Sequence, residues 1–154
     1  MFHSVKLKSA FVTIVSFACV IIFVLICLVS LRGGLPAKVN VGGEQFSLRA
    51  QNEEDIAALL TVCGYENAEL LSERGITVPK HWNETYTQYN DLQRAQGLDL
   101  TSYKGKTATE RTYSISDDDD LTLLIADGRV IAAHICHTDG TGMRPLFTES
   151  SKES

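Results

Sequence analysis

The stretch LTLLIADGRVIAAHICH, residues 121–137, decides the fold of this chain. Its two halves, Leu121–Ala126 and Arg129–His137, have the length and residue types of β-strands. Between them stands Asp127-Gly128, a pair typical of the two-residue turn that joins neighbouring antiparallel strands. The stretch therefore predicts a β-hairpin near the end of the chain.

The segments before this hairpin predict three further strands. Thr107–Ser116 is rich in threonine and contains Tyr113, so it predicts a strand that extends the hairpin into an antiparallel meander. Earlier strands are predicted at Glu44–Arg49, where apolar and polar residues alternate, and at Ile76–Val78, which ends before Pro79.

Two helices are predicted between these strands. The first follows Asn52, a good N-cap, and places its apolar residues at helical spacing before Gly64: Ile56, Leu59, Leu60 and Cys63. The second covers 80–96, because the apolar residues Trp82, Tyr86, Tyr89 and Leu92 recur every three or four positions before Gly97. The order of elements predicts an α+β fold, a two-layer α/β sandwich with a C-terminal antiparallel β-meander over residues 44–147, followed by a disordered tail, 148–154.

The N-terminal part contains a run of 22 residues, Ala10–Leu31, without a charged side chain. A run of this length predicts an N-terminal transmembrane helix, and the alternative is a cleaved secretory signal. Lys6 and Lys8 precede the run and Arg32 follows it, so residues 1–9 are expected in the cytoplasm. The expected protein is single-pass in the cell membrane, with a linker, 32–43, and an extracytoplasmic domain.

Charge is divided unevenly along the chain. Residues 1–38 carry four basic and no acidic residues, whereas the remainder carries 10 basic and 19 acidic residues, a formal net charge of −9. Such a domain repels phosphate backbones, which argues against nucleic acid as a partner. The expected partner is an envelope protein with a basic surface, and the acidic turn Asp117, Asp118, Asp119 and Asp120 is the candidate partner-binding site.

Metal and catalytic chemistry find little support in the sequence. His134 and Cys136 share one face of the predicted strand while His137 points to the other, so these three side chains cannot hold one zinc ion together. The acidic turn lacks the glycine and distal glutamate of a calcium loop. We therefore predict no metal, no cofactor and no catalytic residue, with Cys63 and Cys136 as free, buried thiols; a disulfide between them is the alternative.

Tyr86, Tyr89 and Asn90 are the candidate residues for a ligand groove, because tyrosine rings often line carbohydrate and peptide grooves. The alternative is that this aromatic face of the second helix packs on the sheet. Asn90, Gln93 and Gln96 lie beside the aromatic face and can bond the backbone near the helix end.

The same helix carries a resemblance to a known family. Its motif runs YTQYNDLQ at 86–93, then QGLDL at 96–100 and YKGK at 103–106, with LLIADGRVI at 123–131, Cys136 and Gly142-Met143 farther on. This pattern resembles a family of short membrane-anchored proteins of Gram-positive anaerobes, described only as a domain of unknown function. The resemblance covers about Glu53 to Leu146, and residues 117–120 and His134 depart from it. It implies a location and a domain, and no activity.

The sequence as a whole predicts a non-catalytic binding or interaction module. One alternative is a cell-envelope enzyme, hydrolase-like, that uses Cys136 or an acidic pair. Another is a signalling accessory protein, although a cytoplasmic segment of about nine residues is too short to fold.

Overall fold

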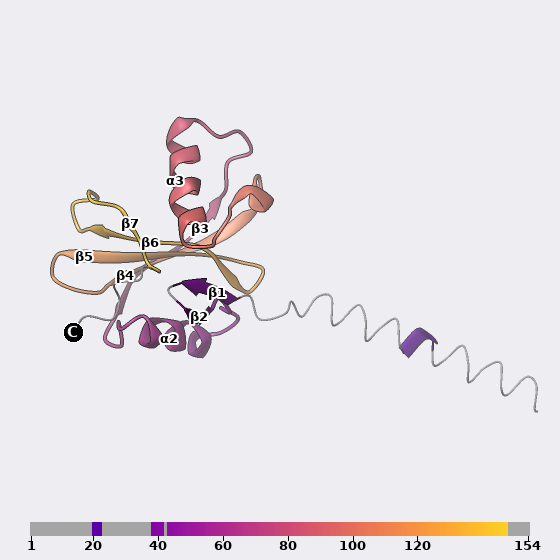
Figure 1. Cartoon of the computed structure of the whole chain (residues 1–154), viewed down its shortest axis with the longest axis horizontal. Coiled ribbons are helices and arrows are strands. Elements are labelled where there is room, and N and C mark those ends of the chain that lie inside the picture. The colour runs from indigo at the N-terminus through magenta and orange to yellow at the C-terminus, as the bar shows by residue number, and fades with distance from the viewer. Residues whose placement is uncertain (1–19, 23–37, 42, 148–154) are drawn as a thin grey trace, which may run out of the picture. The chain divides into compact units, whose positions relative to one another are not determined.

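A computed structural model describes residues 20–22, 38–41 and 43–147. Its main feature is a five-stranded antiparallel sheet whose strands follow one another in chain order (Figure 1). The strands are β3 (Glu69–Thr77), β4 (Thr107–Ser114), β5 (Asp119–Ala126), β6 (Arg129–His137) and β7 (Arg144–Pro145). All belong to one compact unit of the chain.

The predicted hairpin is confirmed as β5 and β6. Asp127 and Gly128 form the turn with φ of +52° and +72°, the positive values that a tight two-residue turn requires. The predicted third strand is confirmed as β4, which pairs antiparallel with β5. The strand predicted at Ile76–Val78 is wrong in its length, because β3 begins at Glu69 and runs nine residues along the sheet edge.

A second, two-stranded sheet precedes this meander. It consists of β1 (Lys38–Val41) and β2 (Glu44–Ser47), which pair antiparallel with Val39 opposite Phe46. The side chains of Val39 and Phe46 are both buried. β1 therefore lies inside the stretch 32–43 that the sequence predicts as a linker.

Two helices are confirmed, each with its asparagine cap. In α2 (Glu53–Val62) the side chain of Asn52 accepts a hydrogen bond from the Asp55 amide at 2.8 Å. In α3 (Glu84–Ala95) the side chain of Asn83 accepts one from the Tyr86 amide at 2.9 Å. The second helix therefore begins later than the predicted residue 80, because Asn83 is already its N-cap.

Both faces of the sheet are covered. α2 and the β1–β2 hairpin lie on one face and α3 on the other (Figure 1). Leu121 and Leu123 of β5 belong to the core beneath α2, whereas Leu124 and Ala126 belong to the core beneath α3. The sheet therefore forms a middle layer between two cores.

This arrangement contradicts the predicted two-layer α+β sandwich, which is wrong. The domain is rich in sheet, with few helices, and its main sheet is buried from both sides. The sequence contained a sign of this, because Leu123–Ala126 and Val130–Ala133 are uninterrupted apolar runs, which are typical of strands covered on both faces.

The predicted membrane topology also requires correction. The run Ala10–Leu31 lies outside the described residues except for Val20–Ile22, and the tail 148–154 lies outside them too. Among the described residues, no helix has the length and apolar character needed to cross a membrane. This finding contradicts the transmembrane helix, the single-pass topology and the extracytoplasmic location. The prediction rested on the length and apolar character of the run alone.

Candidate functional site

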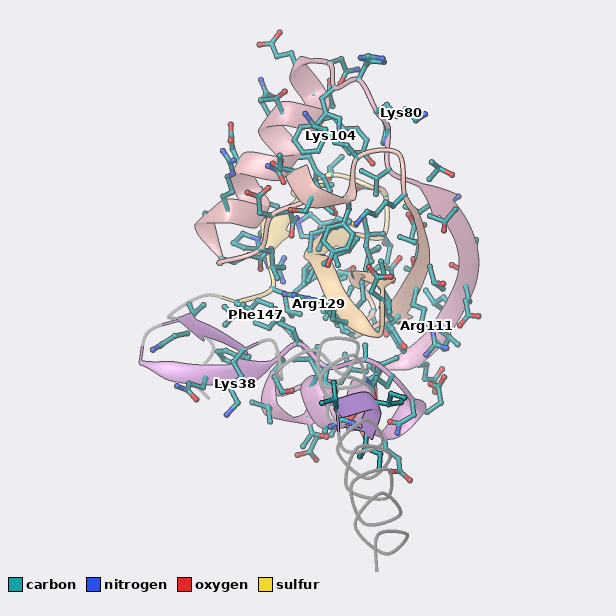
Figure 2. The ribbon with its side chains drawn as sticks, turned by 90° about the vertical axis from the view of Figure 1, so that its right-hand side faces the viewer. Lys38, Lys80, Lys104, Arg111, Arg129 and Phe147 are labelled. Atoms are coloured by element: carbon teal, nitrogen blue, oxygen red, sulfur yellow. The ribbon has the colours of Figure 1, made fainter. Side chains whose placement is uncertain are left out.

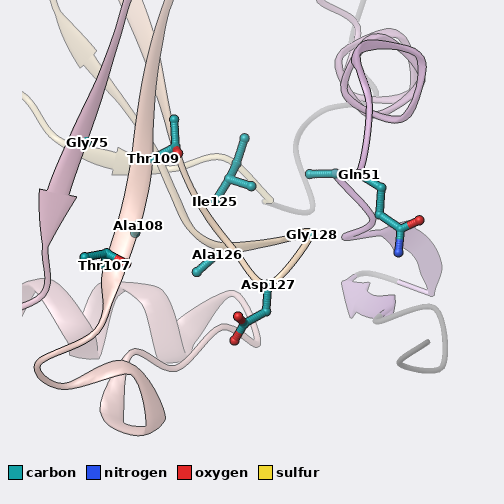
Figure 3. A pocket seen from close by; sticks show the side chains of 10 residues that line it. Gln51, Gly75, Thr107, Ala108, Thr109, Ile125, Ala126, Asp127 and Gly128 are labelled. Atoms are coloured by element: carbon teal, nitrogen blue, oxygen red, sulfur yellow. The ribbon is translucent and has the colours of Figure 1, made fainter. Parts of the chain in front are cut away.

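Two adjoining hollows lie on the described part of the domain, and we call them the groove. The larger has a volume of about 620 Å³ and lies at the end of the sheet beside the β5–β6 turn. Figure 3 shows its lining residues spread over three neighbouring strands, from Gly75 on β3 through Thr109 on β4 to Ile125 on β5. Gln51, which directly precedes the α2 cap, closes the hollow from the other side.

The smaller hollow, of about 210 Å³, continues the groove toward α2. The two hollows adjoin, because four residues line both: Ala50, Gln51, Thr109 and Ile125. A backbone hydrogen bond joins the segment before α2 to the β5–β6 turn: the Ala50 amide donates to the carbonyl oxygen of Gly128 at 2.9 Å. Gln51 also packs on Gly128, where a Cβ would lie 3.0 Å from the Gln51 Cγ.

Arg111 forms the charged wall of the groove. Its guanidinium makes a two-pronged ion pair with Glu53, at the start of α2, with Nη2 2.7 Å from Oε1 and Nη1 2.9 Å from Oε2. Its Nε pairs with Glu73 of β3. The side chain is 15% exposed and lies between the sheet and α2 (Figure 2). The hydrogen bond from Arg111 lowers the pKa of Glu53, so this carboxylate stays ionised at neutral pH.

The four carboxylates of the predicted acidic turn lie in different surroundings. Asp119 is already paired, with its Oδ2 2.9 Å from Arg144 Nη2 and its Oδ1 2.8 Å from His137 Nδ1. The hydrogen bond from Arg144 lowers the pKa of Asp119. Asp120 is half-buried in β5, and its Oδ1 has no hydrogen-bond partner among the described residues. Only Asp117 and Asp118 remain exposed as free carboxylates at the turn.

The two described cysteines are free, as predicted, although only Cys63 is buried and Cys136 is half-buried. Burial raises the pKa of Cys63 to about 12. The pKa of Cys136 is raised by burial and by the carboxylates of Asp120 and Asp119. Both sulfurs are therefore thiols at neutral pH, whereas a nucleophilic cysteine needs a lowered pKa. Among the described residues, no group of three or more His, Cys, Asp and Glu side chains is placed to hold a metal ion.

Tyr86 and Tyr89, two residues of the predicted ligand groove, pack on the sheet beneath α3. Both contact the core on this face, and their rings meet edge to face with centroids 6.0 Å apart. The Tyr89 hydroxyl lies 3.1 Å from Nδ1 of His134 on β6. Burial raises the pKa of Tyr89 and lowers that of His134, so both side chains are neutral at pH 7.

Asn90, the third residue of that prediction, is buried and bonds the chain after the helix. Its Oδ1 accepts a hydrogen bond from the Leu100 amide at 2.8 Å, and its Nδ2 donates to Asp99 at 3.1 Å. The structure therefore brings Tyr86 and Tyr89 together, turns Asn90 inward, and separates all three from the lining of the groove.

A family model described as a domain of unknown function (DUF4830) matches residues 59–135, half of the chain. The chain belongs to the DUF4830 family. No curated protein and no solved structure matches it. The match confirms the family that the motif on α3 indicates; it carries no information on a membrane anchor or on the organism.

In this DUF4830 domain the motif has a structural role at the edge of β6. Ala133 donates its amide to Gln93 Oε1 at 2.9 Å, and Gln96 Nε2 donates to the carbonyl oxygen of Ala133 at 2.6 Å. Gln96 Oε1 accepts from the amide of Phe147, just after β7, at 3.0 Å. Because β7 pairs with β6 only at His134 and Ile135, these amide side chains continue the hydrogen bonding where the short strand ends.

Sequence reasoning missed the groove. Its residues come from the chain before α2, from three strands and from a turn, and no spacing in the sequence links them. One local sign was present: Gly75 interrupts a strand pattern, and an isolated glycine in a strand often marks a bulge or a close approach of another backbone.

Proposed function

We propose that this DUF4830 domain is a non-catalytic binding module whose groove takes a partner with a basic surface. The observation that carries the proposal is the charge of the lining. Three carboxylates, those of Glu53, Glu73 and Asp127, stand against the single guanidinium of Arg111.

The arrangement of these charges leaves a negative rim. Arg111 is engaged by both Glu53 and Glu73, so its charge is offset inside the groove. Asp127 is exposed at the β5–β6 turn and forms no ion pair among the described residues. With a net charge of −9 over residues 39–154, the long-range field attracts the same kind of partner.

The state of the sulfur groups supports binding over catalysis. The raised pKa values of Cys63 and Cys136 keep both sulfurs protonated, and neither cysteine lines the groove. A lowered pKa holds Glu53 fully ionised at neutral pH, where a general acid or base needs a pKa near the working pH. The groove therefore presents fixed charge and shape to a partner.

The proposal is tested with the full chain and a panel of fluorescent peptides whose net charge runs from about −3 to about +3. Affinity, measured by fluorescence anisotropy, is expected to rise with positive charge and to fall as salt is added. The double variant Glu73→Gln, Asp127→Asn removes two rim charges. Asparagine tolerates the positive φ of residue 127, and Arg111 keeps Glu53 as its partner, so the fold is retained.

The matched control is Asp91→Asn, which removes a charge from the exposed surface of α3. We expect the double variant to weaken binding of the basic peptides several times more than the control does. Equal effects of the two variants, or no preference for positive charge in the wild-type chain, would refute the groove as the binding site.

A further inference from the structure

β3 is an edge strand with a long open side. It pairs with β4 on one side, and no described strand pairs with its other side. Along its nine residues every side chain is exposed except that of Ile76, which is half-buried. An edge strand of this kind presents backbone N–H and C=O groups with which an added strand can pair.

Gly75, in this edge strand, has no role that the fold explains. Its φ is not in the positive region where glycine is favoured, and the irregularity in β3 lies elsewhere, between Leu70 and Ser72. A Cβ built on Gly75 meets no atom within 4 Å. Glycine weakens a strand interior, so its use here indicates close approach of another chain over the floor of the groove.

The residues next to Gly75 define what such a chain must carry. On β4, Tyr113, Arg111 and Thr109 alternate and share one face, and their partners on β3 are Leu70, Glu73 and Gly75. Leu70 is 49% exposed and the Glu73 side chain is 47% exposed. One face of β3 therefore presents, in order, an apolar side chain, a carboxylate and an open space above a glycine.

We propose that a partner protein inserts an extended segment antiparallel to β3, with an aromatic residue over Gly75 and a lysine or arginine opposite Glu73. This inference rests on the proposed function and adds the form of the ligand. Read from its N-terminus, the segment runs basic, any residue, aromatic when Glu73 is met first, or the reverse order when Gly75 is met first. The antiparallel direction selects the reverse order, aromatic first, because Gly75 lies nearer the C-terminal end of β3.

Each contact has a physical reason. An aromatic ring on a neighbouring strand covers the bare backbone of an edge glycine, and here it also enters the larger hollow. The basic side chain meets a carboxylate whose charge is only partly offset by Arg111, because Arg111 is shared with Glu53. Backbone hydrogen bonds along the edge supply affinity that does not depend on sequence.

The probe is a synthetic peptide with the core Phe-Thr-Lys-Thr-Leu between Gly-Ser flanks, measured against the full chain by fluorescence anisotropy. A peptide of the same composition with the core order Phe-Lys-Leu-Thr-Thr breaks the alternation and is expected to bind about tenfold more weakly. Methylation of single backbone nitrogens along the core is expected to weaken binding about tenfold at alternate positions only, since alternate amides point toward β3.

The aromatic contact is tested with Gly75→Phe, which brings a ring to this position from the domain's own side; a Cβ at residue 75 meets no atom within 4 Å. Replacing the peptide phenylalanine with alanine is expected to weaken binding about tenfold with the wild-type chain and to have no effect with Gly75→Phe. The matched control is Thr85→Phe on the exposed surface of α3. With this variant, replacing the peptide phenylalanine with alanine is expected to weaken binding as much as it does with the wild-type chain.

The outcomes of these experiments distinguish strand addition from the proposed function on which it rests. If basic peptides bind but backbone methylation and Gly75→Phe change nothing, strand addition is overturned and the charged groove stands. If no basic peptide binds the wild-type chain, the proposed function fails and the strand addition fails with it.

Discussion

Gln96→Leu is the sharpest test of what holds α3 to the sheet. The side chain of Gln96 is 1% exposed and makes three hydrogen bonds, to Gln93, to the carbonyl of Ala133 and to the amide of Phe147. Leucine has a similar size but no polar atom. Gln93 Oε1 keeps the Ala133 amide as its donor, so the substitution leaves two buried backbone groups without their partner.

The magnitude follows from these two groups. Each buried polar group that loses its hydrogen bond costs about 1 to 3 kcal/mol, which gives about 2 to 6 kcal/mol for the pair. Burying a leucine in place of an amide returns about 1 to 2 kcal/mol. We therefore expect the free energy of unfolding to fall by about 1 to 4 kcal/mol, a sizeable part of the about 5 to 15 kcal/mol typical of a domain.

The assay is urea unfolding followed by circular dichroism, with the midpoint expected to fall and the slope m to stay constant. Gln88→Leu is the matched control, because Gln88 is an exposed residue of the same helix, and its amide only approaches Glu84 at 3.4 Å. A Gln96→Leu variant within about 0.5 kcal/mol of the wild-type chain would refute the role assigned to the buried amides.

Two further predictions concern titratable groups. Hydrogen bonds from Thr101 lower the pKa of Asp99 below its unfolded value, so its contribution to stability is fully present above about pH 4 and is lost as the pH falls through the folded pKa. In thermal unfolding measured between neutral and acid pH, Asp99→Asn should lose less stability on acidification than the wild-type chain. The same dependence of stability on pH in both proteins would contradict this. The half-buried Cys136 should react with iodoacetamide before the buried Cys63, whose pKa is raised to about 12 and which should react only on unfolding. Equal rates by mass spectrometry in the folded chain would show that Cys63 is accessible.

The sequence by itself determined the features that depend on neighbouring residues. Asp127 and Gly128 accept the positive φ values of the β5–β6 turn wherever the hairpin packs, so the turn was predictable. Asn52 caps α2 through an amide three residues ahead, which is also a local contact. The family was recognisable for a related reason, since the first stretch of its motif, residues 86–93, is continuous and lies in α3.

Only the tertiary structure decided which side of the sheet each element covers. The apolar runs in β5 and β6 were visible in the sequence, but whether one face or two are buried depends on where α2 and α3 pack. The groove has the same origin: Gln51, Gly75 and Ile125 meet because the chain folds back over three strands. The sequence indicated that Gln96 can bond backbone near the helix end, but its backbone partners, Ala133 on β6 and Phe147 after β7, lie far along the chain. Contacts between residues far apart in the chain leave no spacing to detect, and they are what position the candidate site.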